Sequence, residues 1–400
     1  MRIVCIGGGP AGLYLASLAK QDDPARDVTV LERNPAGVTY GWGVVFGESL
    51  LSDLHRTDPV SARRIADSAA MWQDQHVCVG MEAPVHLGGY GYSIGRQRLL
   101  DILTERAVEL GVRVEFDHEV TDPADLPDAD LLVACDGVHS RLRQRNAEQF
   151  GTRIVAGTNK YIWLGTRRRF DAFTFGFEQT AAGWMWFHGY RFDHDTSTFI
   201  VECSPATWQG NGFEELDPDQ TAAKLEDIFK RHLHGHGLIH RMPGHAEAAW
   251  LSFTGITNRA WAHDNLVLLG DAAHTAHFSI GSGTTLAMDD AIALAGALRE
   301  HADVPEALRA YHRNRLPGVI ELQTEAANSA RWFEQVDHDI GQDPIEFGFC
   351  MLRRRFAAIA PGQRSPLWRY GVYRATQNPT LRRLRHDVTS LHRGLQTRGR

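Results

Sequence analysis

The sequence predicts an α/β protein in which a mostly antiparallel β-sheet is inserted into a parallel-sheet domain, followed by a helical carboxyl-terminal region. Two patterns support this fold class. The beginning of the chain alternates strand, helix and strand, and this alternation returns after residue 264. Between residues 160 and 204, apolar side chains instead recur at every second position, which is the period of a strand. The α/β elements are expected at residues 2–6, 10–20, 28–31, 96–110, 112–116, 130–135, 265–269 and 284–301.

The change of pattern along the chain predicts two interleaved domains and a tail. We expect residues 306–400 to be mostly helical, with Pro317 and Pro344 among the breakers. The first domain is assigned to residues 1–72, 94–154 and 257–325, the inserted substrate domain to residues 73–93 and 155–256, and the tail to residues 326–400.

Composition excludes several classes of protein. No run approaches the ~20 apolar residues of a membrane span, and a strand is expected directly after Met1 in place of a signal peptide. The five cysteines are widely spread, as expected for free thiols in a reducing cytoplasm. The histidine-rich run 232–236 has no carboxylate arrangement, so no metal site is predicted. No nucleic-acid-binding module is evident.

The net charge of -7 conceals a basic carboxyl-terminal segment. Residues 351–400 contain twelve arginines, no lysine and one acidic residue. Such a segment is typical of a solvated or oligomer-forming surface, a nucleic-acid patch or a clamp for an anion.

A glycine-rich motif follows the first strand. Gly7, Gly9 and Gly12 form G-x-G-x-x-G, with Pro10 and Ala11 at the expected helix start. In this Rossmann-like arrangement the glycines permit a tight turn, close approach of a pyrophosphate and close helix packing. The pyrophosphate then lies at the amino terminus of the helix. Glu32, beside Arg33, ends the second strand 20 residues after Gly12, where a carboxylate can bind a ribose hydroxyl.

Two further strands end in acidic motifs. The strand at residues 130–135 leads into Asp136-Gly137, and the strand at residues 265–269 leads into Gly270-Asp271 and a glycine-rich helix start. Each motif alone is also explained as a turn with an aspartate cap.

In this order, the three motifs resemble the p-hydroxybenzoate hydroxylase family of flavin monooxygenases over about the first 330 residues. The resemblance implies a glutathione-reductase-type FAD-binding domain. It implies that Asp271 binds the ribityl chain and that Arg96 lies near the adenosine and ribityl region. Asp136 and Gly137 match the family's motif for FAD and NAD(P)H. Backbone amides near the flavin ring are implied for Gly281, Ser282, Gly283 and Thr284.

Four strings resemble a narrower branch that contains salicylyl-CoA 5-hydroxylase, anthraniloyl-CoA monooxygenases and a tryptophan-derivative hydroxylase of violacein biosynthesis. They lie at residues 41–45, 159–166, 199–203 and 277–281. Within this branch the basic segment favours an aromatic acyl-CoA, because arginine suits phosphate. Arg353, Arg354 and Arg355 are the predicted contacts, and a free aromatic or indole metabolite is the alternative substrate.

The resemblance implies hydroxylation of an electron-rich ring through a flavin C4a-hydroperoxide, with NADH or NADPH as a transient co-substrate and O2 as the oxidant. Such chemistry needs a dry site. Trp163, Phe175, Trp184 and Trp186, with Phe278, are the predicted substrate wall, although alternating aromatics are also typical of a core. His277 and His188 are the candidate bases. Where many members of the family have proline after the Gly-Asp motif, this chain has His277-Phe278.

Two other functions share some of these sequence features. Trp184-Met185-Trp186 matches the W-x-W start of a flavin-dependent halogenase signature, but Phe187-His188 follows in place of Ile-Pro. A non-catalytic FAD-binding redox sensor would share the cofactor motifs. A homodimer is compatible with the sequence, which does not determine the oligomeric state.

Overall fold

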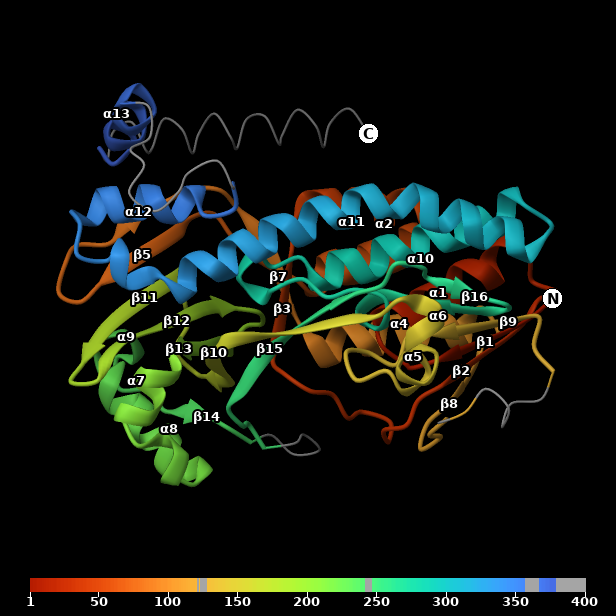
Figure 1. Ribbon diagram of the computed structural model, residues 1–400, viewed down its shortest axis with the longest axis horizontal. Helices are drawn as coiled ribbons and strands as arrows, with labels where there is room; N and C mark the ends of the chain where they lie inside the picture. Colours follow the sequence, from red (N-terminus) through yellow and green to blue (C-terminus); the bar gives the residue numbers. More distant parts are fainter. Residues whose placement is uncertain (121, 123–127, 242–246, 357–366, 379–400) are drawn as a thin grey trace.

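The computed structural model describes residues 1–120, 122, 128–241, 247–356 and 367–378 (Figure 1). Its first layer is a six-stranded sheet in the order β16-β17-β9-β1-β2-β8. All neighbouring pairs are parallel except β16 and β17. The strands are β1 (Arg2–Ile6), β2 (Asp27–Leu31), β8 (Arg113–Glu115), β9 (Leu131–Ala134), β16 (Ala262–His263) and β17 (Leu266–Leu268).

Helices cover this sheet and share its hydrophobic core. The central helix α1 (Pro10–Asp22) packs against α4 (Arg96–Glu109) and α10 (Gly283–Glu300). Ten consecutive residues of α1 are buried, which explains its continuous apolar sequence. The remaining helices of this part are α2 (Glu48–Thr57), α3 (Pro59–Ser68), α5 (Arg141–Arg145) and α6 (Ala147–Phe150).

The second layer is an eight-stranded sheet that is antiparallel except for the pairing of β5 with β11. Both of its faces are covered. On β12, Met185 and Phe187 join one hydrophobic cluster, while Trp186 joins another that includes the carboxyl-terminal helices. The strands are β5 (Gln75–Val79), β6 (Val85–His86), β10 (Arg153–Thr166), β11 (Phe173–Thr180), β12 (Gly183–Arg191), β13 (Ser197–Cys203), β14 (Leu238–Ile239) and β15 (Leu251–Thr257).

The first of these clusters is completed by short helices, namely α7 (Pro205–Gly210), α8 (Pro218–Ile228), α9 (Lys230–Leu233) and the 3₁₀ helix η2 (Phe213–Glu215). The other is covered by α11 (Val304–Glu334), η5 (Val336–His338), α12 (Pro344–Arg353) and α13 (Leu367–Thr376).

A small three-stranded sheet connects the two layers. It consists of β3 (Gly43–Phe46), β7 (Gly91–Gly95) and β4 (Ala70–Trp72). Tyr190 on β12 donates its hydroxyl hydrogen to the carbonyl of Gly43 at 2.7 Å. In the segment before β3, the Trp42 ring packs on Gly165 of β10, and the Trp163 ring packs on Gly41. Large aromatic rings thus pack against glycines between the layers.

These features confirm the predicted fold class. The helical carboxyl-terminal region is present in the described residues, but the breaker role expected of Pro317 was wrong, since α11 continues through it. Packing of α11 against α10 offsets the lost backbone hydrogen bond. Seven of the twelve tail arginines lie outside the described residues. In the described part of the chain, no helix combines the length and apolarity that crossing a membrane requires.

The interlocking of the layers yields a stability prediction. A β-carbon on Gly165 would lie 2.4 Å from the Trp42 ring, so Gly165→Ala should lower the free energy of unfolding by about 1–3 kcal/mol through overpacking. Gly157→Ala on the same strand is the control, because its nearest contact would be an ordinary 3.4 Å. Urea unfolding of both variants measures the difference. Equal midpoints would show that this contact does not constrain the layers.

Candidate active site

The glycine-rich turn lies between β1 and α1. Gly7 has a φ of +119°, and a β-carbon there would lie 2.3 Å from the carbonyl oxygen of Cys135. A β-carbon on Gly12 would lie 2.3 Å from the carbonyl oxygen of Gly7. At the β-carbon position of Gly9, in contrast, no atom of the described residues beyond its chain neighbours lies within 4 Å. The turn is therefore closed on the side of the strands and open at Gly9, before Pro10 and Ala11 begin the helix.

Glu32 is oriented toward this turn. Its carboxylate accepts hydrogen bonds from the backbone N–H of Gly8 at 2.6 Å and of Asn34 at 2.9 Å. Arg33 beside it is exposed.

Asp271 and Arg96 lie in each other's electrostatic field. Solvent reaches the Asp271 side chain, yet protein surrounds it closely enough that desolvation raises the pKa of its carboxyl, with Arg96 acting in the opposite direction. Desolvation lowers the pKa of Arg96, while Asp271 and Glu32 raise it. The Arg96 Nε also donates to the Thr39 hydroxyl at 3.1 Å. Three predicted cofactor residues thus converge from separate segments.

A buried arginine joins the two acidic motifs. Arg143 donates to the carbonyl of Val138 at 2.7 Å and to that of Ala272 at 3.1 Å, which fixes the Asp136-Gly137 turn relative to Asp271. Among the described residues, the buried Oδ1 of Asp136 has no hydrogen-bond partner, and burial raises the pKa of this carboxyl. In the part of the chain that the structure describes, the β-carbon position of Gly137 has no atom within 4 Å apart from its chain neighbours.

Asp290 anchors the other end of the Gly270-Asp271 turn, within η3 (Gly270–Ala272). One carboxylate oxygen accepts the Gly270 N–H at 3.1 Å and lies 2.8 Å from His274 Nε2. The other accepts from Arg315 Nε at 2.8 Å. Burial alone would raise the pKa of Asp290, but His274 and Arg315 lower it. A buried carboxylate therefore holds this turn.

The next segment runs from His277 through η4 (Phe278–Ile280) into α10. Gly281 has a φ of +66°, and its side faces Val45 of β3. Ser282, Gly283 and Thr284 begin α10, where the described structure shows no side-chain cap and no acidic residue in the first turn. The N–H groups at this end are therefore available to a ligand.

Two tail arginines bind this segment. Arg354 is buried, and its guanidinium donates to the carbonyl of Ser279 at 2.9 Å. It also lies over the rings of Phe175 and Phe333. Burial, followed by the neighbouring Arg355, lowers the pKa of Arg354 to about 9. Arg355 donates to the carbonyl of Ile280 at 3.1 Å.

Arg353 lies apart from this segment. Its guanidinium lies over the ring of Phe349. The three consecutive arginines therefore have different environments.

A chain of hydrogen bonds connects Arg354 with His277. The Arg354 Nε donates to Ser329 Oγ at 3.0 Å, Ser329 and Ser279 share a bond of 2.8 Å, and Ser279 Oγ lies 2.9 Å from His277 Nδ1. The backbone N–H of Ser279 also points to His277 Nδ1, at 3.3 Å. Since Nδ1 is the acceptor, neutral His277 carries its proton on Nε2. Burial lowers the pKa of His277 and favours this neutral form.

A second buried group lies on the sheet beside His277. Glu202 accepts from Asn159 Nδ2 at 2.8 Å and from Trp186 Nε1 at 3.1 Å, and His188 Nε2 lies 3.5 Å away. Burial would raise the pKa of Glu202, whereas His188 and His277 lower it. Burial lowers the pKa of His188.

Aromatic rings surround this polar group. The Phe278 ring stacks on His277 and contacts Tyr161 and His188, with centroid distances of 4.3 to 5.5 Å. Phe175 contacts His188 at 5.0 Å. The structure thus brings together His277, Phe278, His188, Phe175 and Trp186.

The two other predicted wall residues, Trp163 and Trp184, form no aromatic ring pair with His277, Phe278 or His188 within the described chain, and their role in the wall stays a prediction. Trp163 packs on Gly41 between the layers, and Trp184 borders the cluster beneath the carboxyl-terminal helices.

Comparison with known proteins identifies the family. The profile of the FAD binding domain family matches residues 1–326. The chain is 39% identical to salicyloyl-CoA 5-hydroxylase of a Streptomyces species, covering 88% of this chain and 70% of that protein. It is 36% identical to 3-hydroxy-4-methyl-anthranilyl-[aryl-carrier protein] 5-monooxygenase of Streptosporangium sibiricum, covering 84% and 90%. The chain belongs to the FAD-dependent aromatic monooxygenases.

Two more similarities agree with this family. Protodeoxyviolaceinate monooxygenase of Chromobacterium violaceum is 32% identical over 87% of this chain and 92% of its own length. The crystal structure of 2-methyl-3-hydroxypyridine-5-carboxylic acid oxygenase has the same fold, with a TM-score of 0.69 at 19% identity, covering 88% of this chain and 98% of that one.

The residues of the monooxygenase fit FAD. Within the described chain, α1 and α10 both begin without a side-chain cap, so their first N–H groups are available to a ligand. The start of α1 suits a pyrophosphate, and the start of α10 suits an electron-rich ring. Open space at Gly9 and the unpartnered oxygen of Asp136 leave room and polarity for a ligand.

Several residues of this site were not predicted. Asp290 lies in the mostly apolar helix α10. An acidic residue among apolar neighbours is a sign of a buried carboxylate with polar partners, and this sign could have identified Asp290. The pairings of Arg143 with Ala272, of Ser329 with Ser279 and of Glu202 with Asn159 join residues that lie 43 or more positions apart, so spacing gave no signal for them.

The anchoring role of Asp290 is testable. Asp290→Asn should lower the free energy of unfolding by about 3 kcal/mol, because it leaves the partly buried Arg315 without its carboxylate partner. Asp289→Asn is the matched control, since burial raises the pKa of Asp289 to about 6 and a neutral side chain is tolerated there. Guanidinium unfolding measures both. If the two variants have the same free energy of unfolding, Asp290 does not anchor the turn.

Proposed function

We propose that this monooxygenase hydroxylates the ring of an aromatic acyl thioester, with a coenzyme A thioester such as salicylyl-CoA as the first candidate. The similarity to salicyloyl-CoA 5-hydroxylase, 39% over 88% of the chain, carries the proposal. The second relative is named for a substrate carried as a thioester on a protein. A free aromatic or indole metabolite is the alternative substrate, and a third relative is named protodeoxyviolaceinate monooxygenase, without mention of a thioester.

The proposed FAD contacts follow the converging residues. The pyrophosphate binds at the start of α1, and Glu32 binds the adenosine ribose. Asp271 and Arg96 bind the ribityl region, and the N–H groups from Gly281 to Thr284 face the ring. When bound, FAD accepts electrons from NADH or NADPH and activates O2 for insertion into the substrate ring.

The protein keeps the reacting ring dry and oriented. Phe278, Tyr161 and Phe175 are the proposed wall, and His188 lies among their rings. His277 is the proposed polar contact. Because its Nδ1 is occupied by Ser279, its Nε2–H is the group that can donate to a substrate hydroxyl, amine or carbonyl oxygen or nitrogen.

Two of the three arginines proposed to bind thioester phosphates have partners within the protein. Arg354 and Arg355 use their guanidinium groups on backbone carbonyls of residues 279–280. Within the described chain, Arg353 is the member of the trio that remains for thioester phosphates.

A substrate screen tests the proposed function. NADH or NADPH oxidation is followed with salicylyl-CoA, anthraniloyl-CoA, free salicylate and an indole substrate, with mass analysis of products. The expected result is hydroxylated product and stimulated oxidation with an acyl-CoA. Product only from a free acid or indole would overturn the thioester assignment, and a halogenated or absent product with every substrate would overturn hydroxylation.

Phe278→Ala should uncouple the reaction. Opening the wall admits water, so NAD(P)H consumption continues while hydroxylated product falls several-fold and hydrogen peroxide rises. Phe356→Ala is the control, because Phe356 is 61% exposed and lies outside the aromatic group. Peroxide and product assays measure the ratio. Unchanged stoichiometry in Phe278→Ala would remove Phe278 from the wall.

A further inference from the structure

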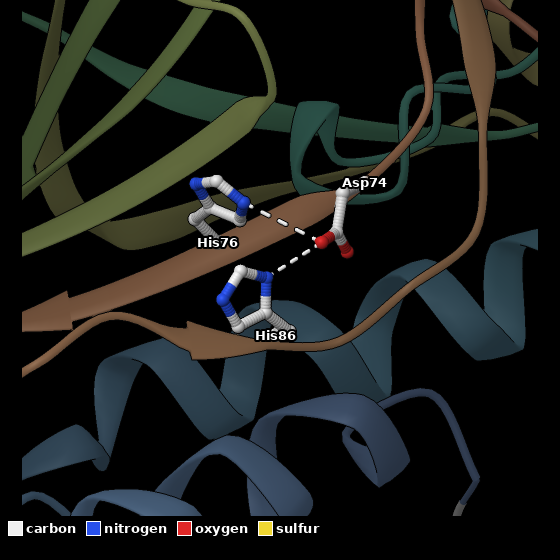
Figure 2. A group of neighbouring side chains, drawn as sticks. All are labelled: Asp74, His76 and His86. Carbon is white, nitrogen blue, oxygen red and sulfur yellow. Dashed lines mark hydrogen bonds and ion pairs between the residues drawn. The ribbon is translucent and has the colours of Figure 1, made fainter. Parts of the chain in front are cut away.

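Three polar side chains converge on the hairpin of β5 and β6 (Figure 2). His76 on β5 is directly opposite His86 on β6 in the antiparallel ladder, and their ring centroids are 4.6 Å apart. Asp74, just before β5, places Oδ2 at 3.4 Å from His76 Nε2 and at 2.6 Å from His86 Nδ1. The three ligand atoms all lie within 4.8 Å of one another.

The backbone fixes the orientation of the carboxylate. Asp74 Oδ1 accepts hydrogen bonds from the N–H groups of Gln75 and Gly88, both at 2.8 Å. Gly88 has a φ of +73°, a conformation that favours glycine and turns its N–H toward Asp74. One oxygen is therefore held by the backbone, and the other faces the two imidazoles. Such outer hydrogen bonds orient carboxylate ligands in metal sites.

The donor set suits a first-row divalent cation. Two imidazole nitrogens and one carboxylate oxygen are ligands that Zn²⁺ accepts, and three protein ligands leave the fourth position to water. With bonds of about 2.0–2.2 Å, tetrahedral ligand atoms are roughly 3.3–3.6 Å apart. The Asp74–His76 distance of 3.4 Å already has this value, and the Asp74–His86 distance of 2.6 Å must widen. The two imidazole nitrogens, which lie within 4.8 Å of each other, must reach a similar separation.

Binding requires no net loss of protons from neutral imidazoles. Without an ion, each ring can direct an N–H to Asp74 Oδ2. With an ion, each ring presents a lone pair and carries its proton on the other nitrogen. The three side chains are 20 to 30% exposed, so an ion can reach them from solvent.

The position of the hairpin gives such a site a structural effect. Gln377, just after α13, bonds both backbone groups of His86, at 3.0 and 2.7 Å. Val85 and Leu87, on either side of His86, face Gly348 of α12. Figure 1 shows β5, α12 and α13 at the end of the molecule opposite to β1 and α1.

We propose that Asp74, His76 and His86 form a binding site for Zn²⁺ or a similar divalent transition metal that fastens the β5–β6 hairpin beneath the carboxyl-terminal helices. The site is separate from the FAD-binding residues. Its test is therefore independent of the substrate.

The test uses the FAD-loaded full chain after treatment with a chelator. Zn²⁺ is titrated by calorimetry, and thermal unfolding is followed at increasing Zn²⁺. Wild type should bind one tight equivalent and show a rising Tm. His76→Gln should bind this equivalent about tenfold more weakly or worse and lose the rise in Tm. His194→Gln is the control, because it removes an exposed histidine beside a single carboxylate, Asp195, and should leave both unchanged.

Co²⁺ provides a second measurement. Wild type should develop the visible absorption of a four-coordinate Co²⁺ site on the red side of the flavin bands, and His76→Gln should not. If Zn²⁺ neither binds tightly to wild type nor raises its Tm, the proposal is wrong and the cluster is a hydrogen-bonded hairpin closure. Equal binding by wild type and His76→Gln also overturns it and assigns the ion to other histidines.

Discussion

The structure depends on buried charged side chains that hold the backbone from Gly270 to Ile280. This segment contains only short 3₁₀ turns. Most of its backbone N–H and carbonyl groups are therefore not paired within a helix or a sheet. Asp290 binds it at Gly270 and Arg143 at Ala272. Arg354 and Arg355 bind it at Ser279 and Ile280. Burying charge is costly, and it is tolerated here because each group is hydrogen-bonded.

These four side chains hold the segment at both of its ends. Asp271 lies between the first two anchors, and the start of α10 lies just after the last two. The aromatic group around Phe278 is then presented to the inserted sheet, where Glu202 and His188 lie. The side proposed for FAD and the side proposed for the substrate are thus parts of one continuous packing arrangement.

Much of the first domain could be predicted, because its signals are local. The strand, glycine turn and helix expected at residues 2–20, and Glu32 after the next strand, follow from spacing alone, and the helix ends two residues later, at Asp22. The tail arginines could not be placed in this way. Their composition favoured an anion clamp, which stays a prediction, and it carried no sign of the carbonyl partners of Arg354 and Arg355, which lie about 75 residues earlier in the chain. Similarly, a helix pattern cannot show that Pro317 is tolerated, because packing against a neighbouring helix compensates for it.

The anchoring by Arg354 also sets an order of events during synthesis. The glycine turn can form its contacts with β1 and β2 early, whereas Ser279 receives its arginine only after 75 further residues have been made. At about 5–20 residues per second, this interval lasts roughly 4–15 s. During this interval, a nascent chain has the elements of a nucleotide-binding fold, but the segment from Gly270 to Ile280 lacks its contact with Arg354. Completion of the proposed cofactor site is thereby coupled to the synthesis of the chain through α12.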